Sequence, residues 1–179
     1  MKTIIFVPIK DYFFSRRKLF AKFLIPLLIA LFALVLSLIF NIEGAEKIVS
    51  VFSQFIDTQV NIVAILISFS VAIITILVSA DNKNIQQLKE TPSNTLQYKP
   101  VNRKQLSLFQ ILLSNIAYNV IIEIVYLICL IAIILIQSIL PIELLKYITS
   151  TCLFFILHIL FVLLESVSQM YLTFWQKKS

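Results

Sequence analysis

The feature of this sequence that most constrains its fold is a set of four long apolar stretches, each of about 20 residues. A helix of that length rises about 30 Å, which is the thickness of the hydrocarbon core of a bilayer. Lipid offers no partners to backbone N–H and C=O groups, so lipid-exposed spans of this kind must be helices. Only 13% of the residues are charged, about half the share in soluble domains. The sequence therefore predicts an all-α integral membrane protein, with one domain over residues 1–179 and transmembrane helices over about 23–40, 60–80, 111–136 and 147–170.

The first apolar stretch could alternatively belong to a signal peptide. Its basic leader is more than twenty residues long, and the apolar run that follows exceeds the length of a signal core. We therefore expect this stretch to be retained as a transmembrane helix.

The placement of Lys and Arg predicts the orientation. All but two of the 15 basic residues fall before the first helix, between the second and third helices, or after the fourth: Lys2, Lys10, Arg16, Arg17, Lys18, Lys22, Lys83, Lys89, Lys99, Arg103, Lys104, Lys177 and Lys178. Only Lys47 and Lys146 lie on the other side. Positive charge marks the cytoplasmic side, so both termini and the loop at 81–107 are expected on the cytoplasmic side of a bacterial inner membrane. The net charge of +6 is then an orientation signal, and direct binding of nucleic acid is the less favoured interpretation.

The segments outside the membrane are small. Residues 10–22 mix aromatic and basic side chains, as in segments that lie on anionic lipid. On the outer side, apolar residues from Ile48 to Ile56 recur at helical spacing and predict a short amphipathic helix after Gly44. That helix could pack on lipid and its own neighbours or contact a partner.

The loop at 81–107 is too short to fold alone. Asn102 and Gln105 have the spacing of a capping box at the start of the third helix. Through Lys99, Arg103 and Lys104 the loop could dock a soluble cytoplasmic protein, or it could be a plain basic connector.

Polar residues within the third and fourth helices form a candidate intramembrane cluster: Asn115, Asn119, Glu123, His158, Glu165 and Gln169. Glu123 lies 18 residues before Pro141 and His158 lies 17 after it, so an antiparallel hairpin would place them at similar depth. Ionisable groups in a membrane usually face a protein interior or water. The cluster could line a pore, carry protons or act as a switch. Equally, it could fix helix packing.

The second helix carries a ridge of small residues, formed by Ala64, Ser68, Ala72, Thr75 and Ser79. Small side chains let transmembrane helices approach closely. The ridge could therefore join subunits of a homo-oligomer, or pack within one chain.

No motif for a reaction is present. One Gly rules out a phosphate-binding glycine loop, and one His with two Cys offers no zinc cluster. We expect no cofactor, no metal and no enzymatic activity.

Size, four helices, cytoplasmic termini and a basic inner loop together resemble the small membrane subunit of a bacterial anti-phage system, such as Kiwa. The resemblance concerns only the size and the arrangement of helices, so it assigns no functional role to any residue of this chain. It implies an oligomeric membrane sensor, scaffold or effector that recruits a soluble cytoplasmic partner for antiviral defence. The alternative function is an oligomeric pore for ions or protons, lined by polar residues of the third and fourth helices. A membrane-embedded enzyme is the third possibility.

Overall fold

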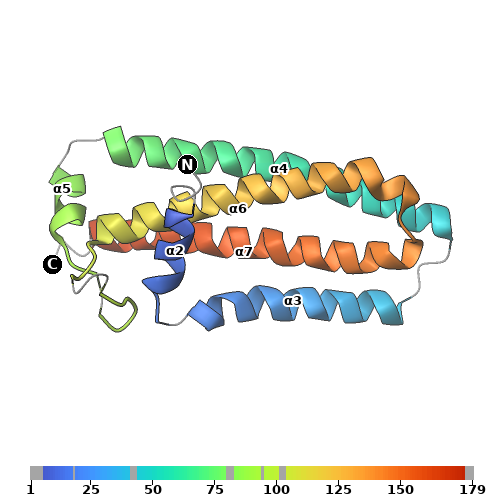
Figure 1. The fold of residues 1–179 in the computed structure, drawn as a ribbon, viewed down its shortest axis with the longest axis horizontal. Helices are drawn as coiled ribbons and strands as arrows, with labels where there is room; N and C mark the ends of the chain where they lie inside the picture. The colour runs from blue at the N-terminus through green and yellow to red at the C-terminus, as the bar shows by residue number, and fades with distance from the viewer. Residues whose placement is uncertain are drawn as a thin grey trace. The chain divides into compact units, whose positions relative to one another are not determined.

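The computed structural model describes residues 6–17, 19–40, 44–79, 83–93, 95–100 and 104–175. Its helices, shown in Figure 1, are α2 (Val7–Phe14), α3 (Leu19–Ile39), α4 (Ala45–Ser79), α5 (Lys83–Glu90), α6 (Leu108–Ile136), the short 3₁₀ helix η1 (Gln137–Ile139) and α7 (Ile142–Trp175). Four of the described helices are long and apolar enough to cross a membrane, with candidate spans over Lys22–Ile39, Glu46–Ser79, Leu108–Ile139 and Ile142–Tyr171. The all-α prediction with four such helices is confirmed at that level.

The predicted short amphipathic helix is not a separate element. Helix α4 runs without interruption over 35 residues, because neither Pro nor Gly occurs within it. Gly44 directly precedes this helix and has a φ of 94°, which favours glycine. The apolar face predicted near Ile48 to Ile56 therefore belongs to the first turns of a helix about 52 Å long.

The start of α6 also differs from the prediction. Ser107 and Gln110 form the capping box: the Ser107 N–H donates to Gln110 Oε1 at 2.9 Å, and the Gln110 N–H donates to Ser107 Oγ at 3.2 Å. The predicted cap at Asn102 lies outside the described residues. The third helix starts at Leu108 because Ser-x-x-Gln offers the same exchange of hydrogen bonds directly before the apolar run.

The contacts within the chain define two compact units, and α4, α6 and α7 contribute residues to both. The second unit, residues 21–67 and 122–160, holds an apolar core. This core consists of Phe52, Ile56, Val63, Tyr126, Leu130, Leu145, Cys152, Ile156 and Ile159. Two hydrogen bonds add to the packing: Tyr126 Oη donates to the Cys152 carbonyl at 3.0 Å, and Ser150 Oγ donates to the Ala30 carbonyl at 2.8 Å. These hydrogen bonds join α7 to α6 and to α3 within this unit.

The first unit, residues 1–20, 68–121 and 161–179, contains the predicted loop. The loop closes on itself, since the Ser93 N–H donates to the Leu106 carbonyl at 2.8 Å and the Leu108 N–H donates to the Thr91 carbonyl at 2.9 Å. The side chain of Gln105 also donates to Ser93 Oγ at 2.7 Å. Hydrogen bonds therefore hold the described residues on the two sides of the loop together.

Candidate functional site: a buried arginine network

The N-terminal arm and the loop meet at a short antiparallel bridge. Arg16 pairs with Tyr98, and the flanking hydrogen bonds run from the Arg17 N–H to the Gln97 carbonyl at 3.0 Å and from the Lys99 N–H to the Ser15 carbonyl at 2.7 Å. Residues directly opposite each other in such a pair present their side chains on the same side. The bridge therefore holds the side chains of Arg16 and Tyr98 next to each other.

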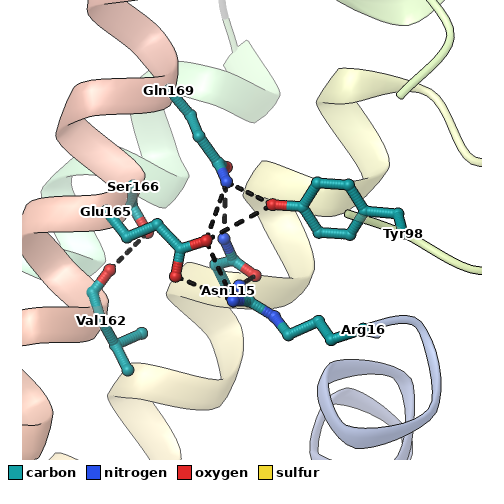
Figure 2. Close-up of polar contacts among 7 residues, drawn as sticks. All are labelled: Arg16, Tyr98, Asn115, Val162, Glu165, Ser166 and Gln169. Carbon is teal, nitrogen blue, oxygen red and sulfur yellow. Dashed lines mark hydrogen bonds and ion pairs between the residues drawn. The ribbon is translucent and has the colours of Figure 1, made fainter. Parts of the chain in front are cut away.

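Arg16 extends to groups on α6 and α7. Its Nη1 donates to both carboxylate oxygens of Glu165, at 2.8 and 3.0 Å, and its Nη2 donates to the amide oxygen of Asn115. Figure 2 shows the guanidinium between the two helices. The side chain of Arg16 is 2% exposed and that of Glu165 is 23% exposed. This ion pair is therefore largely buried within the protein.

Gln169 and Tyr98 complete the network (Figure 2). The Gln169 amide nitrogen donates to Glu165 Oε1 at 3.1 Å and to the hydroxyl of Tyr98, and the Asn115 amide nitrogen donates to Gln169 Oε1 at 3.3 Å. The Tyr98 hydroxyl in turn lies 3.4 Å from Glu165 Oε1, to which it donates. One cation thus joins the arm, the loop and two membrane-class helices at a single point.

Tyrosine rings cover the guanidinium. Its central carbon lies 4.2 Å from the centre of the Tyr12 ring, a distance at which cation–π attraction operates. Tyr12 stacks on Tyr118 of α6, with ring centres 3.8 Å apart and planes 6° from parallel. Burial raises the pKa of Tyr98 to about 12, although the charge of Arg16 opposes this rise. The pKa of Tyr12 is raised for the same reason, so both rings are neutral at physiological pH.

The structure brings together only part of the predicted polar cluster. Asn115, Glu165 and Gln169 share the arginine network. Asn119, Glu123 and His158 are also buried, at 1%, 0% and 2% exposure. The imidazole of His158 stacks on the ring of Phe23, with centres 4.3 Å apart. Contact between Glu123 and His158 stays a prediction.

Sequence reasoning missed Arg16 and Tyr98. Residues 10–22 were predicted to lie on anionic lipid, and the exposed rings of Phe13 and Phe14 are compatible with that role. Tyr12 and Arg16, however, are buried in protein. The missed signal is Glu165 itself, because a charged carboxylate in an apolar helix is stabilised by a cation, and Arg16 belongs to the basic arm that precedes the first helix.

The predicted docking residues of the loop are accessible where the structure describes them. Lys99 and Lys104 are exposed, and Arg103 lies outside the described residues. The ridge on α4 is exposed along its whole length, at Ala64, Ser68, Ala72, Thr75 and Ser79. Among the residues that the structure describes, neither feature is covered by the rest of the chain.

Chemistry-bearing groups are sparse. Within the described ranges, no group of three or more His, Cys, Asp or Glu side chains is placed to hold a metal ion. Cys129 is an exposed free thiol and Cys152 a buried one. The arrangement offers charge pairing and hydrogen bonding.

Comparison of the chain with protein-family models, curated proteins and solved structures finds no match.

Proposed function

We propose that this protein is a non-enzymatic, multi-pass protein of the bacterial inner membrane that recruits a soluble partner to its cytoplasmic face. The observation that carries the proposal is the arginine network. It fixes the arm and the loop onto α6 and α7 through Arg16, so a change in the helices would be transmitted to the cytoplasmic segments. Such a connection suits a sensor or scaffold.

The surface next to this network supplies the means of recruitment. Lys99 follows directly after Tyr98 in the bridge, and both Lys99 and Lys104 are exposed. Complementary charge raises the rate and specificity of protein association. A partner with an acidic surface would therefore bind where the position of the loop depends on the membrane helices. The plan that the chain shares with anti-phage membrane subunits favours viral defence as the setting.

Oligomerisation is the second part of the proposal. The small-residue ridge of α4 is exposed, and in lipid such ridges allow close backbone packing between helices. A homo-oligomer built on α4 would present several basic loops together, and multivalency would strengthen partner binding.

The alternative function is an oligomeric pore. In that arrangement polar groups would face a lumen between subunits. Asn119, Glu123 and His158 instead lie buried within one chain, which favours the scaffold. Ion flux from proteoliposomes that hold the purified protein would favour the pore.

Photocrosslinking in living cells tests recruitment directly. A crosslinking amino acid at Thr95, an exposed loop position, should form an adduct with one soluble protein in a constant ratio. Lys104→Glu should reduce that adduct at least about fivefold, the effect of losing roughly one charge contact of about 1 kcal/mol. Lys47→Glu, an equal change of charge at an exposed position on α4, is the control and should leave the adduct unchanged. Equal adduct yields in both variants would contradict docking by the loop.

A further inference from the structure

A pocket in the second unit has the features of a lipid site. Its volume is about 190 Å³, larger than the ~150 Å³ apolar cavity that is known to hold benzene. It lies between the end of α3 and the first turns of α4 and α7, with Ala33, Phe52 and Leu153 in its wall. Eight of the twelve residues that line it are aliphatic or aromatic.

The hydroxyl groups of the pocket are directed at helix backbone. Ser37 Oγ donates to the Leu34 carbonyl, Thr149 Oγ1 to the Leu145 carbonyl, and Ser150 Oγ to the Ala30 carbonyl, each at 2.8 Å. Each hydroxyl proton is thereby used inside the protein. The wall consequently presents a surface suited to a hydrocarbon chain and poorly suited to a polar ligand.

Among the residues that the structure describes, one charged side chain lines this pocket. Lys146 is half-buried there, in the second turn of α7. Glu46 and Glu143, in the first turns of α4 and α7, are exposed. A lysine combines an apolar stem with an ammonium that remains at the polar end of a site. The pocket therefore matches an amphiphile with an apolar tail and an anionic head.

We propose that this pocket binds one acyl chain of an anionic phospholipid, with the headgroup phosphate at Lys146. Phospholipid is the solvent of membrane-spanning helices, so it is the amphiphile present at the highest concentration around them. Bound lipid would fill the space between α3, α4 and α7, and would link the packing of α3 to membrane composition. This inference is independent of the docking of a cytoplasmic partner.

The test uses full-length protein reconstituted in phosphatidylcholine vesicles with a small fraction of phosphatidylglycerol that carries a photoreactive acyl chain. After illumination, mass spectrometry should locate the label on pocket residues of α3, α4 and α7. Excess unlabelled phosphatidylglycerol should compete for this labelling, whereas excess phosphatidylcholine should not. Labelling that follows lipid exposure alone, with no preference for the pocket and no such competition, would overturn the proposal.

Matched variants test the two parts of the site. Lys146→Gln should reduce labelling by the anionic probe about fivefold and leave labelling by a photoreactive phosphatidylcholine unchanged, whereas Lys47→Gln should change neither. Ala33→Phe should fill the pocket and abolish its labelling, whereas Leu38→Phe, at an exposed α3 position outside the pocket, should not. If Ala33→Phe fails to fold, the lipid competition on the unmodified protein still decides the question. Equal labelling in Lys146→Gln and Lys47→Gln would contradict the anionic headgroup.

Discussion

Arg16 holds a full positive charge in a place where only 2% of its side chain is exposed. Burial of a charge costs several kcal/mol unless partners replace the lost hydration. Here the replacement comes from the carboxylate of Glu165, the amide oxygen of Asn115 and the face of the Tyr12 ring. At the scale of single residues, the arm and the loop are therefore attached to α6 and α7 by directional contacts that converge on Arg16.

Arg16→Met should lower the free energy of unfolding by about 3 kcal/mol, because it leaves the carboxylate of Glu165 without its cation. The lower end of the usual range applies, since Glu165 is 23% exposed. Denaturation in mixed micelles, followed by circular dichroism, measures the change. Arg17→Met is the control: Arg17 is exposed and should cost less than about 0.5 kcal/mol. Equal losses in the two variants would mean that the ion pair does not stabilise the fold.

Glu123 and His158 offer a second test among single residues, because both are buried in the second unit. If they touch, as their distances from Pro141 predict, the losses in Glu123→Leu and His158→Leu should be non-additive by at least about 0.5 kcal/mol in the double variant. The pair of Glu123→Leu with Thr151→Val, an exposed α7 position, should be additive. Additive losses in both double variants would show that the side chains of Glu123 and His158 are not in contact.

At the scale of elements, the hydrophobic pattern was sufficient to predict the four long helices. Where the pattern predicts transmembrane helices over 23–40 and 111–136, the structure has helices over Leu19–Ile39 and Leu108–Ile136. The difference at α4 arises because an amphipathic stretch and an apolar stretch follow each other without a helix breaker. The change in hydropathy therefore predicts two helices, whereas the backbone forms one continuous helix. Pairing between Arg16 and Tyr98 could not be predicted, since an isolated bridge between two loops has no periodic signal.

The exposed ridge of α4 leads to a prediction about association. Ser68→Leu with Ala72→Leu should separate the backbones of neighbouring subunits and lower the oligomer mass in mild detergent, as measured by light scattering. Ile65→Leu, an exposed position beside the ridge, keeps the side-chain volume and should leave the mass unchanged. An oligomer that survives the double substitution would assign its interface to another face.

At the scale of the whole molecule, the chain has four helices long and apolar enough to cross a membrane, and its arm and loop are fixed on two of them, α6 and α7, through Arg16. Proposed recruitment requires that the loop faces the cytoplasm and that the turn between α6 and α7 faces the opposite side. The distribution of Lys and Arg supports this orientation. Partner docking by Lys99 and Lys104 is impossible in the reverse orientation.

Cysteine accessibility measures that orientation directly. In a background that carries Cys129→Ala and Cys152→Ala, single cysteines replace Thr95 in the loop or Ser138 in η1, both exposed polar positions. A membrane-impermeant maleimide added to intact spheroplasts should label the Ser138→Cys variant, and should label the Thr95→Cys variant only after the membrane is permeabilised. Labelling of the Thr95→Cys variant in intact spheroplasts would contradict a cytoplasmic loop and, with it, the recruitment of a cytoplasmic partner.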